Sequence, residues 1–303
     1  MNLQTVVTIT PTQVVLQRIN LDRDTEIVLQ KVIQWQKGKL AEAIAIALQE
    51  IPETKRIRIL LTESLYYGVG FSVEKKLARD RDYIREKASE VLIEDLETVR
   101  WDYATAYTTL ELAYVQVICL TKAIDEELSE LTKNLGVIVD AIVPESLVLL
   151  ESFLEKNESF ILIYSDEYIK TISVVKDGLV LISTGFTQPQ VVDRFLQTVQ
   201  YAQNHLQFSA DTVVVSGVKD SELSEVKKNF KIVRAQLHVT TIFAELNAYR
   251  GRDEKVLSIR LDQGAGFAGF QENKSGMQIF LGIIFFVALV GIIFGIVVAG
   301  NLF

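Results

Sequence analysis

The stretch FILIYSDEYIKTISVVKDGLVLISTGF, residues 160–186, decides the fold class. It contains three apolar runs rich in β-branched residues, which predict three consecutive antiparallel strands at 160–164, 171–175 and 179–184. Asp177-Gly178 separates the last two runs, and this dipeptide is typical of a tight hairpin turn. A helix is predicted at 189–206, and a short buried strand at 213–216 follows it. Strands mixed with returning helices indicate an α/β fold.

The first half of the chain opens with the same kind of signal. Two short β-rich runs at 5–10 and 13–19 are separated by Pro11 and Thr12, which predicts a hairpin. The segments beyond it predict strands at 57–61, 99–106, 113–120 and 137–143. Helices are predicted at 39–49, 80–92, 124–134, 145–154, 221–230 and 240–249. Hairpins that open both halves suggest a duplicated fold, although we find no sequence repeat that proves it.

Residues 279–299, IFLGIIFFVALVGIIFGIVVA, contain no charged side chain. At a rise of about 1.5 Å per residue, a helix of this length spans roughly 30 Å, the thickness of the hydrocarbon core of a bilayer. The sequence therefore predicts one transmembrane helix over 277–300, preceded by a flexible Gly-rich linker over 252–276. Because the span comes last and the N-terminus lacks a signal-peptide pattern, we expect a tail-anchored protein.

Charge and cysteine content indicate where the protein works. Lys274 and Arg260 precede the span and no Lys or Arg follows it, so the positive-inside rule places the N-terminal part in the cytoplasm. The single cysteine, Cys119, excludes an intrachain disulfide and agrees with a reducing compartment. The net charge of -8 argues against nucleic acid as a partner and against adsorption to anionic lipid. We therefore expect contact with the bilayer through the helix and not through surface charge.

The order of these elements resembles that of the PilM family of type IV pilus assembly proteins, and of its type II secretion relative GspL, over nearly all of residues 1–250. The matching stretches are RIRILLTESLYYGVGF (56–71), ETVRWDY (97–103), YVQVICLTKAIDEELSELTKNLGVIVDAIVPESLVLL (114–150), residues 160–186 and DTVVVSGV (211–218). The resemblance implies an actin-like, ribonuclease H-like duplicated α/β fold over a cytoplasmic domain at 1–251. It also implies an inserted α+β subdomain at roughly 55–137.

In active members of this fold, two Asp-containing hairpin loops and a Gly-Gly turn hold ATP and Mg²⁺. The first loop at 9–13 has neither an acid nor a glycine here, and its Pro11 lacks a backbone N–H. The second, at 164–168, has two acids and no glycine, and the third, at 216–218, keeps one glycine. If a nucleotide binds, the resemblance assigns it to Thr10, Thr12, Ser165, Asp166, Ser216 and Gly217. The eroded loops favour the absence of any cofactor.

Other motifs have simpler interpretations. Gly264, Gly266 and Gly269 match G-x-G-x-x-G, but no βαβ unit surrounds them, so we assign them to the linker. The spacing of Gly291, Gly295 and Ala299 places small residues on one face of the predicted span. That face either packs against another helix, which would allow a homodimer, or reflects scattered small residues. The two histidines lack companions at ligand spacing, so we expect no metal site.

Three functional hypotheses remain open on the sequence. The first is a non-catalytic scaffold subunit of a type IV pilus or type II secretion-like machine, anchored by a single pass in the cell inner membrane. The resemblance implies inner-membrane pilus or secretion proteins and the assembly ATPase as its partners. The alternative is a membrane-tethered, nucleotide-binding actin-like ATPase that acts as a switch or forms filaments. A sugar-kinase-like enzyme on the same fold is the third.

Overall fold

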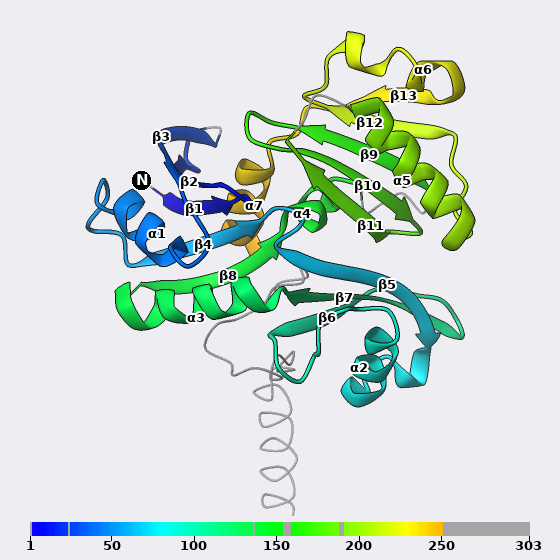
Figure 1. Ribbon diagram of the computed structural model, residues 1–303, viewed down its shortest axis with the longest axis horizontal. Helices are drawn as coiled ribbons and strands as arrows, with labels where there is room; N and C mark the ends of the chain where they lie inside the picture. Colours follow the sequence, from blue (N-terminus) through cyan, green and yellow to red (C-terminus); the bar gives the residue numbers. More distant parts are fainter. Residues whose placement is uncertain (1, 24, 136, 154–158, 188–190, 251–303) are drawn as a thin grey trace, which may run out of the picture. The chain divides into compact units, whose positions relative to one another are not determined.

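The computed structural model describes residues 2–23, 25–135, 137–153, 159–187 and 191–250 (Figure 1). These residues belong to one compact unit, Met1–Ala268, and a second unit, Gly269–Phe303, lies outside them. None of the described helices is long and apolar enough to cross a membrane. The linker predicted at 252–276 and the span predicted at 277–300, with its packing residues Gly291, Gly295 and Ala299, fall outside the described residues.

The first sheet is built around the N-terminal hairpin. Its strands are β1 (Leu3–Ile9), β2 (Gln13–Asn20), β3 (Glu26–Gln34), β4 (Arg56–Leu61) and β8 (Ile138–Pro144), in the order β3-β2-β1-β4-β8. The β1, β2 and β3 strands are antiparallel, whereas β4 and β8 run parallel to β1. Helices α1 (Leu40–Leu48) and α3 (Lys122–Leu135) pack together beside this sheet, and α7 (Val239–Arg250) contacts β1 and β2.

A second sheet repeats this topology. Its strands are β9 (Phe160–Ser165), β10 (Lys170–Lys176), β11 (Leu179–Phe186), β12 (Thr212–Ser216) and β13 (Lys231–Arg234), in the order β11-β10-β9-β12-β13. Three antiparallel strands are again followed by two parallel ones, which is a duplication of the first sheet at the level of the fold. The apolar face of α5 (Val191–His205) covers β10, while η2 (Asp220–Leu223) and α6 (Val226–Asn229) connect β12 to β13.

A third, smaller sheet lies between β4 and β8 in the chain. It contains β5 (Tyr66–Glu74), β6 (Trp101–Thr108) and β7 (Leu112–Leu120) in the antiparallel order β5-β7-β6. The η1 turn (Lys75–Leu77) and α2 (Arg81–Ser89) connect β5 to β6, and the side chain of Asp80 caps α2 by accepting from the Tyr83 N–H. This sheet has its own hydrophobic cluster around the buried Trp101.

Most of the sequence-based elements are present, and the differences have local reasons. Asp177 and Gly178 both have positive φ, of 51° and 76°, which confirms the predicted tight turn. Two strands were not predicted from the sequence: β3, an edge strand with many exposed residues, and β5, which contains Gly68 and Gly70. The helix predicted at 221–230 is wrong as one element, because η2 and α6 are two short turns.

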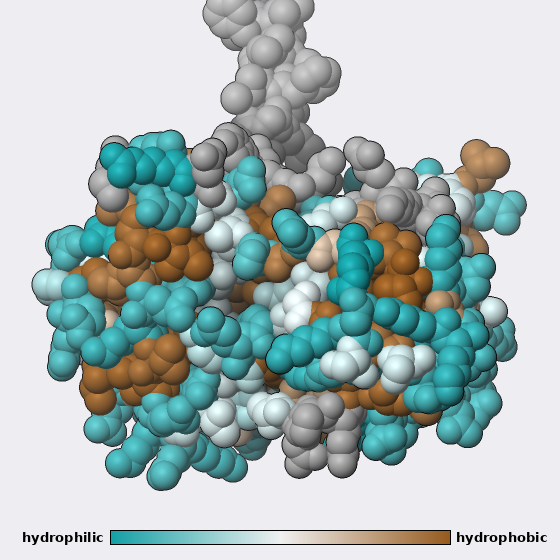
Figure 2. Space-filling model, turned by 90° about the horizontal axis from the view of Figure 1, so that it is seen from above, coloured by the Kyte–Doolittle hydropathy of each residue, from teal (hydrophilic) through white to brown (hydrophobic). Residues whose placement is uncertain are grey.

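The surface is mainly hydrophilic and still exposes some apolar groups. In Figure 2, hydrophilic side chains cover much of the visible face, and hydrophobic ones form separate patches between them. Three of the large exposed hydrophobic side chains, Ile27, Val28 and Val32, lie on the edge strand β3. Such isolated patches are common on folded domains.

A side-chain amide attaches the third sheet to the second. Gln116, in the middle of β7, is 5% exposed. Its Nε2 donates to the Val180 carbonyl at 3.1 Å, and its Oε1 accepts from the Val180 N–H at 3.1 Å. A side chain that bonds both polar groups of one residue imitates a β-ladder between β7 and β11.

We expect Gln116→Ala to lower the free energy of unfolding by about 1–3 kcal/mol, because it leaves two buried polar groups of Val180 without partners. Denaturant unfolding followed by circular dichroism measures the change. Glu111→Ala, at an exposed site between β6 and β7, is the matched control and should change stability by less than about 0.5 kcal/mol. Equal losses in the two variants would contradict this role of Gln116.

Candidate functional site

The first predicted nucleotide loop, the β1–β2 turn, bonds its own backbone. Thr10 is 2% exposed, and its Oγ1 accepts from the N–H groups of Gln13 at 3.0 Å and Thr12 at 3.4 Å. Its carbonyl accepts from Trp35 Nε1 at 2.8 Å. The side chain of Thr12 is exposed beside it. The Thr10 hydroxyl thus holds the backbone of its own turn, and the Trp35 indole, just after β3, holds the turn from outside.

The second predicted loop, the β9–β10 turn, is closed in the same way by Asp166. Its Oδ1 accepts from the N–H groups of Tyr168 at 2.7 Å and Ile169 at 2.8 Å. Burial raises the pKa of the Asp166 carboxyl, and these two N–H donors act in the opposite direction. The turn also touches the first sheet, because Gln30 Nε2 donates to the Tyr168 hydroxyl at 2.6 Å.

The third predicted loop, which follows β12, is in close contact with the second, the β9–β10 turn. Because β12 runs parallel to β9 with Ser216 opposite Tyr164, Gly217 comes up against Ser165. Gly217 has φ of +71°, and a Cβ atom there would lie 1.8 Å from the Ser165 carbonyl oxygen. The Ser216 hydroxyl accepts from the Leu237 N–H at 3.1 Å. The glycine is therefore required by backbone packing alone.

The structure brings four of the six predicted residues into adjoining turns of the second sheet, namely Ser165, Asp166, Ser216 and Gly217. Thr10 and Thr12 lie in the β1–β2 turn of the first sheet. Phosphate loops bind anions through backbone N–H groups that are free to point at the ligand. In the β1–β2 and β9–β10 turns, a side chain of the turn itself accepts those N–H groups. Binding of a nucleotide to these residues stays a prediction.

Two buried carboxyl groups, which the sequence analysis did not single out, lie where the first and second sheets meet. Glu63 is 2% exposed and Glu145 is fully buried. Glu63 follows β4 and Glu145 begins α4 (Glu145–Glu151) directly after β8. Because β4 and β8 are parallel neighbours, with Leu61 opposite Pro144, both acids emerge at the same edge of the sheet. Acids that directly follow two buried, adjacent parallel strands were the signal available in the sequence.

Glu63 is the hub of this cluster. Its Oε1 accepts from the hydroxyls of Tyr66 at 2.9 Å and Ser183 at 2.9 Å, and its Oε2 accepts from Thr171 Oγ1 at 3.1 Å. Tyr66 begins β5, whereas Thr171 and Ser183 belong to β10 and β11. One carboxyl group thus joins all three sheets. Burial, followed by the charge of Glu63, raises the pKa of the Tyr66 hydroxyl well above its ordinary value.

Glu145 lies beside this hub with fewer partners. Its Oε2 is 3.2 Å from Thr171 Oγ1, no donor reaches its Oε1, and its side chain is also within hydrogen-bond reach of the Glu63 carboxyl. Burial raises the pKa of the Glu145 carboxyl well above its ordinary value, and the nearby Glu63 and Asp166 carboxyls raise it further. The structure therefore favours an uncharged Glu145.

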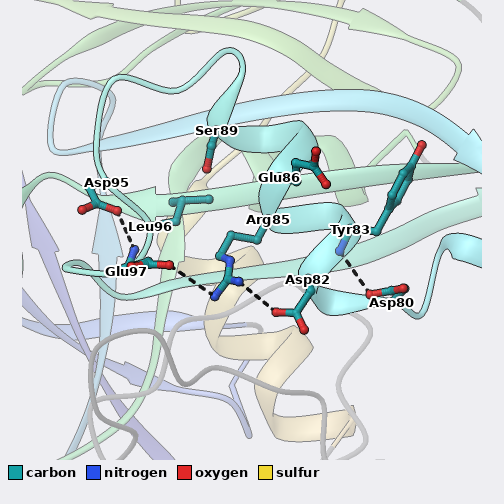
Figure 3. A pocket seen from close by; sticks show the side chains of 9 residues that line it. All are labelled: Asp80, Asp82, Tyr83, Arg85, Glu86, Ser89, Asp95, Leu96 and Glu97. Atoms are coloured by element: carbon teal, nitrogen blue, oxygen red, sulfur yellow. Dashed lines mark hydrogen bonds and ion pairs between the residues drawn. The ribbon is translucent and has the colours of Figure 1, made fainter.

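The described residues also form two hollows, one beside Glu63 and one beside α2. A cavity of about 160 Å³ borders the hub and is lined in part by Glu63, Tyr66, Gln116, Ser146 and Ser183. A shallower hollow of about 590 Å³ lies beside α2, and Figure 3 shows its acidic lining. There Arg85 lies 3.0 Å from Asp82 and 3.9 Å from Glu97. Within the described ranges, no group of three or more His, Cys, Asp and Glu residues could hold a metal ion.

Comparison with known proteins defines the fold class. The chain aligns with a Bacteroides thetaiotaomicron protein of actin-like ATPase fold and unknown function, at TM-score 0.52 and 14% identity over 80% of this chain and 95% of that chain. It aligns with cyto-EpsL, the cytoplasmic domain of an inner membrane component of the Vibrio cholerae type II secretion system, at TM-score 0.55 and 10% identity over 88% of this chain and all of the other. The protein therefore has an actin-like fold.

A protein from a type IV pilus complex has a similar fold. A chain of the PilM-PilN type IV pilus biogenesis complex aligns at TM-score 0.56 and 12% identity, over 79% of this chain and 89% of that chain. The PilM/GspL-like fold inferred from the sequence is confirmed by these likenesses. No family model matches the sequence, and no curated protein matches it either.

We expect Gly217→Ala to destabilise the protein by at least about 2 kcal/mol, because it places a methyl group against the Ser165 carbonyl at a backbone conformation unfavourable for L-residues. Thermal unfolding measures the loss. Gly68→Ala is the control, because the nearest atom to its added Cβ is 3.6 Å away. A Gly217→Ala protein as stable as Gly68→Ala would show that the turn rearranges freely.

Proposed function

We propose that this chain is a non-catalytic, membrane-anchored scaffold subunit of a type IV pilus or type II secretion-like assembly machine. The observation that carries the proposal is the self-closure of both hairpin turns. Thr10 accepts N–H groups of the first turn and Asp166 accepts N–H groups of the second. A phosphate group could use those donors only if the turns first broke these bonds, at a cost for each buried polar group left unpaired.

The environment of Asp166 supports the same conclusion. An Asp that positions Mg²⁺ must be ionised and must direct an oxygen toward the ion or its water. The Asp166 carboxyl is instead committed to the N–H groups of Tyr168 and Ile169, and its pKa is raised by burial. On this proposal the actin-like fold is kept as a rigid platform, and nucleotide turnover is not part of its role.

The proposed anchor is the predicted transmembrane helix at 277–300, connected through the linker at 252–276. It places the actin-like domain at the cytoplasmic face of the cell inner membrane. The likeness to cyto-EpsL and to the PilM-PilN complex supports inner-membrane pilus or secretion proteins as partners, and the sequence resemblance adds the assembly ATPase to this proposal. Gly291, Gly295 and Ala299 would form the face through which this helix contacts a neighbour, including a second copy.

We expect the full chain in detergent to show no calorimetric heat and no thermal shift with Mg-ATP at millimolar concentration. Asp166→Ala should lower the free energy of unfolding by about 1–3 kcal/mol, because two backbone donors lose their acceptor, and should leave the ATP result unchanged. Asp211→Ala, at an exposed site, serves as the control for stability. Micromolar ATP binding that Asp166→Ala abolishes would instead establish a membrane-tethered nucleotide switch.

The partners can be tested in native membranes of the source cell. Cross-linking followed by purification of the tagged full chain should recover inner-membrane components of a pilus or secretion machine. A tagged span comprising residues 277–300 alone serves as the control for contacts made only within the bilayer. Recovery of no such component by the full chain would contradict the scaffold proposal.

A further inference from the structure

In the cluster around Glu63 and Glu145, there are too few donor hydrogens for every short oxygen–oxygen contact to be a hydrogen bond. Thr171 Oγ1 lies 3.1 Å from Glu63 Oε2 and 3.2 Å from Glu145 Oε2. A hydroxyl carries one hydrogen, so Thr171 can donate to only one of these carboxyl groups. If both acids were ionised, the other carboxylate would face the Thr171 oxygen across a hydrogen-bond distance without a hydrogen between them. Geometry alone therefore calls for an additional proton.

The neighbouring hydroxyls show which acid holds that proton. Tyr66 and Ser183 donate to Glu63, and their oxygens are 2.7 Å from the hydroxyls of Ser146 and Ser173, respectively, which can donate to them. Thr171 completes three donors to Glu63, the arrangement that suits an ionised carboxylate. Glu145 then carries the proton and can donate it to Thr171 Oγ1 or to the neighbouring Glu63 carboxyl, to which its side chain is also hydrogen-bonded. No N–H or O–H group donates to its Oε1, which costs far less for a neutral group than for a charged one.

Two carboxyl groups oppose a negative charge on Glu145. Glu63 faces it from the β4–β5 segment and Asp166 from the turn after β9, while the uncharged hydroxyls of Tyr66 and Tyr164 are its other ionisable neighbours. Among the described residues, no Lys, Arg or His forms an ion pair with either acid. Like-charge repulsion and burial therefore both favour a single negative charge on the pair.

We propose that Glu63 and Glu145 form a proton-binding latch, in which one proton on Glu145 fastens β10 of the second sheet to β4 and α4 of the first. Loss of the proton leaves two carboxylates on one hydroxyl, and the junction opens by separation of the second sheet from the first. The latch is independent of the proposed scaffold function, because it rests on the junction contacts and not on the hairpin turns.

The direction of the pH dependence follows from proton counting. The folded chain holds the Glu145 proton at pH values where an unfolded glutamate has lost it, because the pKa of this carboxyl is raised. Stability from the latch is thus complete below the ordinary glutamate pKa and is lost as pH rises through the raised value. Glu145→Gln resembles the protonated acid in shape and cannot ionise, so it should remove this dependence.

The test is hydrogen exchange on the full chain in detergent, between about pH 5 and about pH 9, corrected for intrinsic amide exchange. In the wild type, the opening constant of amides in β4, β10 and β11 should rise by up to about tenfold per pH unit, as expected for release of one proton. In Glu145→Gln this opening constant should be independent of pH. Glu86→Gln, at an exposed site on α2, should behave as the wild type.

Infrared spectroscopy of the wild type gives a second, mutation-free measurement. A protonated carboxyl band should persist at neutral pH, where exposed glutamates are ionised, and should disappear as the junction amides open. Identical pH profiles for the wild type and Glu145→Gln would overturn the latch. So would the absence of the band at neutral pH, or its loss with no change in junction exchange. If Glu145→Gln does not fold, the wild-type band and exchange profile still decide the matter.

Discussion

The placement of the three sheets depends on one buried carboxyl group, which follows a strand of the first sheet and accepts hydrogen bonds from the second and the third. Glu63 is almost withdrawn from water, yet hydroxyls of β5, β10 and β11 all donate to it. Burial of an acid is tolerated only where such partners are fixed in place, so the sheets must come together for the acid to be satisfied. The close packing of Gly185 against Glu63, where an added Cβ would meet the Glu63 Cβ at 3.0 Å, shows how little room the junction leaves.

Two side-chain amides also form hydrogen bonds between the sheets. Gln116 bonds both polar groups of Val180, and Gln30 reaches the Tyr168 hydroxyl. A shared hydrophobic cluster, which includes Leu60 and Leu162, supplies the apolar burial beneath these polar contacts. A fold of two duplicated halves needs contacts that fix one half relative to the other. In this chain, side chains at the junction make these contacts, whereas the N–H groups of the β1–β2 and β9–β10 turns are bonded to side chains of their own turns.

How far the sequence could predict this arrangement depended on whether each signal was local. The Asp177-Gly178 turn and the apolar runs of β9 and β10 are decided within a few residues, and the structure has them. The β3 strand was missed because its apolar residues come in runs, at 27–29 and 32–33, and do not alternate with polar ones, although Leu29 and Ile33 pack against the core. The hub was missed for a different reason: Thr171 and Ser183 lie 108 and 120 residues from Glu63, so nothing near the acid reveals its partners.

The predicted nucleotide residues illustrate how a glycine can be kept for structure alone. Gly217 was assigned to a binding turn because the resemblance to the PilM family suggested one, but the contact with the Ser165 carbonyl already excludes any side chain there. Thr10 and Asp166 likewise have full structural roles in their own turns. The loop donors are thus bonded within their own turns and are not free to sense a ligand. On the proposals made above, a change of conditions acts instead on the proton held by Glu145, since loss of this proton would open the joint between the two duplicated halves.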